Sequence, residues 1–147
     1  MSKTLNMEQL FNTMMQFVKF MSHYSQESHE ERLATMLQFS ALSFLKDQPN
    51  GTVGELAKFM QLSKSSATQL IERLVNAELV ERIHDQEDRR IIRLFITPKG
   101  KEEFITLRKN IMEKMNKFVS KIPAKDISEL IRIHTNLIET LKKEQNG

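Results

Sequence analysis

A length of 147 residues, with 39% hydrophobic and 28% charged side chains, suits a single globular domain and does not suit a disordered chain. The absence of cysteine excludes disulfides, thiolate nucleophiles and cysteine-based redox switching, and a net charge of +3 is weak evidence for a polyanionic partner. Because no apolar run reaches the ~18 to 20 residues of a membrane-spanning helix and no secretory signal is visible, we expect a cytoplasmic protein.

The N-terminal part of the chain predicts two helices separated by a polar segment. Apolar residues recur at helical spacing from Leu5 to about Met21, and again from about Leu33 to Leu45. The stretch Ser25–Arg32 between them is polar and lacks periodicity, so we expect a linker or a frayed helix end. Pro49 and Gly51 end the second helix.

Two closely spaced N-cap signals then predict a helix-turn-helix. Thr52 and Glu55 form a capping-box pattern, in which the hydroxyl and the carboxylate each satisfy a backbone N–H at the start of a helix. That short helix is expected to end near Gln61, and Ser63 offers the next N-cap. Two helices joined by so few residues are typical of a helix-turn-helix.

The C-terminal half predicts a hairpin followed by two long helices. Leu79–His84 and Ile91–Ile96 are β-prone segments on either side of a charged loop. Thr97-Pro98 supplies an N-cap and a proline at the first helical position, and the helix that follows should run to about Ile122. After Pro123, a last helix is expected from about Lys125 to Lys143, with His134 as a hydrogen-bonded core or interface residue on its apolar stripe.

The fold class that follows is mainly α with a small β-hairpin wing, a winged helix-turn-helix. Its DNA-binding lobe would span residues 33–100. The helices in residues 1–26 and 101–147 carry more apolar surface than one small domain covers easily, so we expect them to form the interface of a homodimer. A monomeric bundle is the alternative.

The second helix of the helix-turn-helix is the element expected to read DNA. Its apolar face holds Ala67, Leu70, Ile71 and Leu74, and its polar face holds Ser65, Thr68, Gln69, Glu72 and Arg73. Gln69 can pair bidentately with adenine, and Arg73 can reach a phosphate or a base edge. Lys64, Ser65 and Ser66 lie at the helix N-terminus, which favours phosphate. The alternative is an ordinary solvated face, but this is the helix that enters the groove in such motifs.

The loop of the hairpin is the second candidate contact with DNA. Arg89 and Arg90 at its tip can place a guanidinium in a narrow minor groove, where the potential is most negative. Asp88 can orient the neighbouring arginine through a fork-like pair. The alternative is a charged tip that only keeps the hairpin soluble.

These residues resemble the signature of the MarR family. Members carry D-x-R-x-x-x-L-x-L-T in the wing, and Asp88, Arg90, Leu94, Ile96 and Thr97 match it with isoleucine in place of the second leucine. The resemblance implies a dimer on a pseudo-palindromic operator, with Arg90 in the minor groove. One departure is Glu78, where members often have a left-handed glycine. The cost of a non-glycine there is on the order of 1 kcal/mol, which predicts a locally different turn.

The resemblance also implies a small amphipathic or aromatic effector that binds between the dimerisation helices and the DNA-binding lobe. Candidate lining residues are Phe17, Met21, Phe39 and Phe44, although each is also what an ordinary core contains. Two other functions stay open. One is a metal-responsive regulator using His23, His29 and His84 with Glu27, Glu30 or Glu31, although these show no tight ligand spacing. The other is a winged-helix protein-interaction module that does not bind DNA.

An enzyme is not expected. The sequence has no glycine-rich phosphate loop, no G-x-S-x-G and no histidine recognisably paired with a nucleophile and a carboxylate. We therefore expect neither a catalytic site nor a cofactor.

Overall fold

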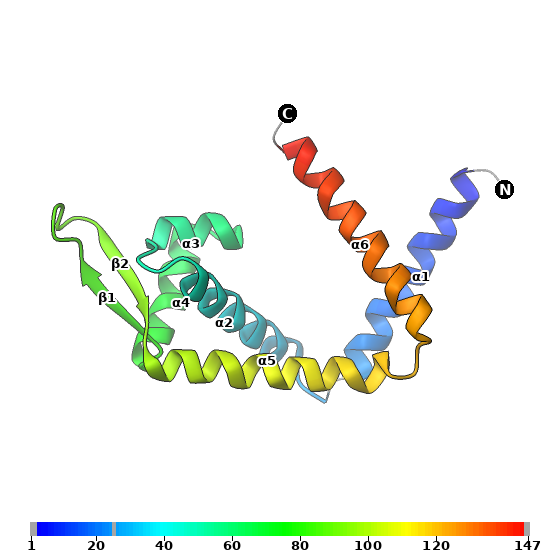
Figure 1. The fold of residues 1–147 in the computed structure, drawn as a ribbon, viewed down its shortest axis with the longest axis horizontal. Helices are drawn as coiled ribbons and strands as arrows, with labels where there is room; N and C mark the ends of the chain where they lie inside the picture. Colours follow the sequence, from blue (N-terminus) through cyan, green and yellow to red (C-terminus); the bar gives the residue numbers. More distant parts are fainter. Residues whose placement is uncertain (1–2, 25, 146–147) are drawn as a thin grey trace. The chain divides into compact units, whose positions relative to one another are not determined.

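The computed structural model describes residues 3–24 and 26–145 and confirms a mainly helical chain with one hairpin (Figure 1). The elements are α1 (Lys3–Tyr24), α2 (His29–Asp47), α3 (Val53–Met60), α4 (Lys64–Asn76), β1 (Val80–His84), β2 (Ile92–Ile96), α5 (Pro98–Val119) and α6 (Ala124–Gln145). The chain divides into two compact units, the first reaching to Phe104 within α5 and the second beginning at Ile105.

The start of α2 differs from the sequence prediction. Part of the polar stretch that we expected to be a linker is helical, because Ser28 and Glu31 form a complete capping box. The Ser28 hydroxyl accepts a hydrogen bond from Glu31 N at 3.1 Å, and the Glu31 carboxylate accepts one from Ser28 N at 2.7 Å. These two bonds lower the pKa of Glu31. Arg32 adds a link back to the carbonyl of Ser22 at 3.2 Å.

The core of the first unit lies between α2, α3, α4 and the hairpin. The largest side chains that are fully buried come from all of these elements: Leu42, Leu45, Leu56, Ile71, Val80 and Leu94. The start of α5 joins this core, since Phe104 is buried and stacks on Phe39 of α2 with ring centroids 5.1 Å apart. The core therefore fixes α4 and the hairpin on one framework.

The hairpin is an antiparallel pair in which Val80 lies opposite Ile96 and His84 lies opposite Ile92. Strand β2 is also attached to the α2–α3 turn, where Leu94 N donates to the Gly51 carbonyl at 2.8 Å. Only Leu94 of β2 is fully buried, while Ile92 and Ile96 are partly exposed. The hairpin is thus fixed at its base and open to solvent toward its tip.

The second unit contains the rest of α5 and all of α6. Helix α5 ends at Val119, slightly earlier than expected, and α6 begins directly after Pro123. His134 of α6 is exposed, and its Nδ1 lies 2.8 Å from the Leu130 carbonyl oxygen. The single chain therefore provides the expected hydrogen bond, but it does not bury the imidazole ring. Among the described residues, none of the helices is long and apolar enough to cross a membrane.

Exposed large apolar side chains are most numerous on two helices, α1 in the first unit and α6 in the second. On α1 they include Leu10, Phe11, Met14, Val18 and Phe20, the last of which is 74% exposed. On α6 they are Leu130, Ile131, Ile133, Leu137, Ile138 and Leu141. Apolar surface of this extent is unusual for a helix that faces only water.

Candidate nucleic-acid interface

Helix α4 is held by its apolar face and leaves its polar face open. Its N-cap is Ser63, whose hydroxyl accepts from Ser66 N at 3.1 Å, as the sequence predicted. Ala67, Leu70, Ile71 and Leu74 are buried, whereas Lys64, Ser65, Ser66, Gln69 and Arg73 are exposed. Thr68 is partly exposed, and its hydroxyl donates to the Lys64 carbonyl at 2.8 Å.

Two long polar side chains lie at the centre and the end of this face. Gln69 and Arg73 make no side-chain hydrogen bond or ion pair with any residue in the part of the chain that the structure describes. Both are therefore available to an external partner, the amide as donor and acceptor and the guanidinium as a forked donor.

A tight turn places α4 against α3. Gln61 caps α3 in the left-handed conformation with a φ of 53°, and Leu62 N donates a hydrogen bond to the Ala57 carbonyl oxygen at 2.9 Å. Thr52 and Glu55 form the expected capping box at the other end of α3, with bonds of 2.7 and 3.1 Å. Because capping fixes both ends of α3, the helix-turn-helix geometry is set locally.

The tip of the hairpin is built around Asp85. One carboxylate oxygen accepts from Glu87 N at 2.9 Å and from Asp88 N at 3.1 Å, while the other accepts from Arg93 Nε at 2.9 Å. The hydrogen bond from Arg93 is the main cause of a lowered pKa of Asp85, followed by those from the two backbone N–H groups. The loop is thus ordered by an ionised carboxylate.

Asp88 and Arg90 form the pair that the sequence suggested. Asp88 Oδ1 accepts from both Arg90 N at 3.0 Å and Arg90 Nε at 3.1 Å. The Arg90 side chain is nevertheless 92% exposed, so the pair orients the guanidinium and does not bury it. Arg89 is also exposed, and its carbonyl lies 2.8 Å from His84 Nδ1.

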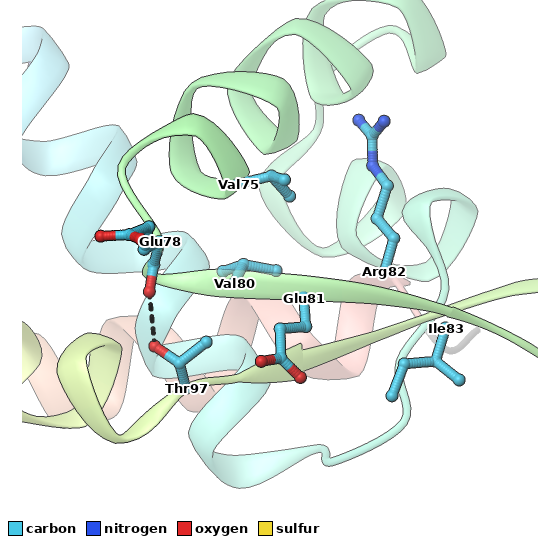
Figure 2. A pocket seen from close by; sticks show the side chains of 7 residues that line it. All are labelled: Val75, Glu78, Val80, Glu81, Arg82, Ile83 and Thr97. Atoms are coloured by element: carbon cyan, nitrogen blue, oxygen red, sulfur yellow. Dashed lines mark hydrogen bonds between the residues drawn. The ribbon is translucent and has the colours of Figure 1, made fainter.

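The junction between α4 and β1 keeps a left-handed residue in spite of its side chain. Glu78 has a φ of 61°, so the turn that we expected to change is retained. Figure 2 shows the Thr97 hydroxyl donating to the Glu78 carbonyl, at 2.7 Å, and Lys99 forms an ion pair with the Glu78 carboxylate at 3.0 Å. These contacts hold the strained residue between α4 and the start of α5.

An open groove of about 410 Å³ lies beside this junction (Figure 2). It is lined by Val75, Glu78, Val80, Glu81, Arg82, Ile83 and Thr97. None of the four residues suggested for an effector lines it. Phe44 is instead a core residue, 5.1 Å from the Phe59 ring, Phe39 packs on Phe104, Phe17 is exposed and Met21 is partly exposed.

The histidines do not assemble a metal site in the described ranges. Among the side chains that the structure describes, no group of three or more histidine, aspartate or glutamate residues comes together in a way that suits a metal ion. Glu31 is engaged in the α2 capping box and His84 contacts Arg89. The side chain of His23 lies outside the described residues.

A comparison with known families covers the region just described. Residues 34–92, which contain most of α2, the helix-turn-helix and the hairpin as far as Ile92, match the sequence model of the MarR family. Over these residues the chain is similar to the MarR family. The resemblance that the wing residues suggested is therefore confirmed.

Curated proteins similar to this chain are named as regulators. It is 40% identical over 81 residues to the uncharacterized HTH-type transcriptional regulator YsmB of Bacillus subtilis, across 53% of this chain and 56% of the relative. It is 34% identical over 97 residues to the HTH-type transcriptional repressor MdtR of the same organism, across 64% and 63%. The matches thus span between about half and two thirds of these relatives. Their names agree with the expectation that the chain is not an enzyme.

The fold of the chain is also that of a solved structure. The YusO protein of Bacillus subtilis superimposes with a TM-score of 0.73 at 24% identity, and the alignment covers 95% of this chain and 99% of that one. At this identity the likeness concerns the fold alone. It supports the winged helix-turn-helix architecture along nearly the whole chain.

Sequence reasoning missed two residues of the wing, Asp85 and Arg93. The sequence placed Asp85 only within a charged loop and Arg93 only within a β-prone segment. Aspartate at the start of a turn often accepts a hydrogen bond from the backbone N–H two residues later, which forms an Asx turn. This preference would have identified Asp85. Arg93 carried no comparable local signal, because one of its partners, Asn50, is 43 positions away.

Proposed function

We propose that this chain is a sequence-specific transcription regulator that binds double-stranded DNA as a homodimer. Lys64, Ser65, Ser66, Thr68, Gln69 and Arg73 of α4 and Asp88, Arg89 and Arg90 of the wing are the proposed DNA-binding residues. Residues 33–100 form the proposed DNA-binding lobe. Residues 1–26 and 101–147 supply the proposed dimerisation helices.

The observation that carries this proposal is the exposed face of α4. Four buried apolar residues anchor the helix, while Gln69 and Arg73 have no partner among the described residues. Small hydroxylated residues at the N-terminal end allow the backbone to approach the floor of a major groove. The same core carries the wing, whose exposed arginines suit a minor groove.

The exposed apolar residues of α1 and α6 support the dimer. Side chains such as Phe20 and Ile131 are mostly exposed in the single chain, and burial against a second copy would remove them from water. A two-fold dimer presents two copies of α4, which read half-sites about 10 base pairs apart on a pseudo-palindromic operator.

Selection from a random pool of duplexes tests the proposal directly. We expect a two-fold symmetric consensus with half-sites separated by about one helical turn. Failure to enrich any duplex, even at low ionic strength where phosphate contacts are strongest, would contradict DNA binding.

Arg90→Ala is expected to weaken binding to the selected duplex and to reduce the slope of log K against log salt by about one unit. The reason is the loss of one exposed guanidinium that neutralises phosphate charge in or beside the minor groove. The measurement is a salt titration of binding by fluorescence anisotropy. Arg132→Ala, which removes one positive charge from α6, is the control and should leave the slope unchanged.

Gln69→Ala is expected to change which base is preferred at one position of each half-site, by ~1 to 3 kcal/mol. A bidentate amide contact discriminates adenine from the other bases, and alanine cannot form it. Selections with the variant and the parent chain should therefore give different consensus sequences. Asn76→Ala, at the last residue of α4, is the matched control and should reproduce the parent consensus.

We propose further that the protein is a repressor that a small amphipathic or aromatic effector releases from its operator. The support for repression is the name of the relative MdtR, and the support for an effector is the MarR resemblance itself. The proposed effector contacts are Phe17, Met21, Phe39 and Phe44, of which Phe39 and Phe44 also pack against other aromatic rings. A screen of phenolic compounds for release of the selected duplex tests this part.

A further inference from the structure

A pair of contacts from Arg93 connects the wing to the turn between α2 and α3. Arg93 Nη1 donates to the Asn50 carbonyl at 3.3 Å, and Arg93 Nε donates to Asp85 Oδ2 at 2.9 Å. Backbone contacts accompany them, because Arg93 bridges to Thr52 and the next residue, Leu94, donates to Gly51. One guanidinium therefore joins the helix-turn-helix to the loop of the hairpin.

The connection continues from Asp85 to the tip. The oxygen of Asp85 that Arg93 does not contact accepts from the N–H of Asp88 at 3.1 Å, and the Asp88 carboxylate in turn accepts from Arg90. From Asp85 to the tip the exposure of the side chains rises, from 19% at Asp85 through 39% at Asp88 to 92% at Arg90. The path thus begins in the lobe and ends at the residue proposed to contact the minor groove.

We infer that Arg93 is a positioning residue, which fixes the wing so that Arg90 meets DNA in a preset orientation. This inference rests on the proposed function. A two-stranded hairpin is marginal by itself and needs outside contacts to be ordered. A tip that is ordered in advance loses less conformational freedom on binding, which raises affinity without adding a contact.

The geometry requires arginine at this position and not merely a positive charge. Arg93 uses two different nitrogens, Nε for Asp85 and Nη1 for Asn50, in one planar group. The single ammonium nitrogen of lysine keeps the charge but lacks the fork. Arg93→Lys therefore separates positioning from electrostatic attraction.

A double-mutant cycle with Arg93→Lys and Arg90→Ala tests the inference on the selected duplex. We expect Arg93→Lys alone to lower affinity about tenfold, and to change it less than about twofold when Arg90 is already alanine. Arg93→Lys should also reduce the slope of log K against log salt, as Arg90→Ala does, although lysine keeps the positive charge. Arg132→Lys, which disturbs the Arg132–Glu129 pair of α6, is the matched control and should change neither affinity nor slope.

Amide hydrogen exchange gives a second readout that does not need DNA. Arg93→Lys should speed exchange at the N–H groups of Asp88 and Arg90, while amides in α4 keep their protection. Asp85→Asn should have the same effect if Arg93→Lys proves poorly folded. Unchanged exchange at the tip, or independent effects of the two substitutions on affinity, would overturn the inference. If the parent chain binds no duplex, the proposed function fails, and exchange alone decides whether Arg93 orders the wing.

Discussion

Gly100→Ala is expected to lower the free energy of unfolding by about 3 kcal/mol, a large share of the stability of a small domain. A Cβ at this position would lie 2.1 Å from the Leu79 carbonyl oxygen and 2.9 Å from Ile96 Cγ1. The carbonyl cannot easily move, because it accepts from Thr97 N at 3.0 Å next to the base of the hairpin. Denaturant unfolding followed by circular dichroism measures the loss.

Gly54→Ala is the matched control for this substitution. Its Cβ would meet only the Thr52 hydroxyl, at the ordinary distance of 3.9 Å, in the first turn of α3. Alanine has the higher helix propensity, so we expect a gain of about 0.5 to 1 kcal/mol. If Gly100→Ala is as stable as the parent chain, then the first turn of α5 does not pack against the hairpin as closely as it does in the structure.

The helix starts could be predicted because the contacts that determine them are local. Thr52 with Glu55 correctly marked the start of α3, and Ser63 that of α4. In each case a side chain bonds a backbone group three positions away, so the pattern is visible in the sequence. Ser28 and Glu31 carry the same pattern, and the prediction of a linker or frayed end was wrong from His29 to Arg32 because the polar character of the segment was given more weight than the cap.

The arrangement around the wing could be predicted only in part. Asp88 and Arg90 are two positions apart, and their pairing was expected from the sequence. The contact from Arg93 to the Asn50 carbonyl brings distant positions together, and neither residue type predicts it. Pairing of this kind appears only once the core has placed β2 against the α2–α3 turn.

Glu78 shows how tertiary contacts override a local preference. A non-glycine residue in the left-handed region costs on the order of 1 kcal/mol, which favoured a changed turn from sequence alone. The structure retains the turn, and the Thr97 hydroxyl and Lys99 both contact Glu78 there. The local cost is therefore small beside the contacts that join α4, β1 and α5.

Leu137→Glu is expected to abolish dimer formation and to weaken binding to the selected duplex by about 100-fold or more. Leu137 is 55% exposed in the single chain, so the substitution should leave the folding of that chain nearly unchanged. In a dimer it would place a charge in an apolar interface, where burial of an unpaired carboxylate is strongly unfavourable. A monomer engages one half-site and loses the advantage of two linked contacts.

Asn136→Glu separates this effect from added charge alone. It introduces the same residue one position away, on the opposite face of α6 from the apolar stripe. Sedimentation equilibrium should find the control dimeric and Leu137→Glu monomeric, with the loss of duplex affinity following the loss of the dimer. Because α6 is remote in sequence from every proposed DNA-contacting residue, a Leu137→Glu protein that stays dimeric and binds normally would refute the role of this helix in assembly.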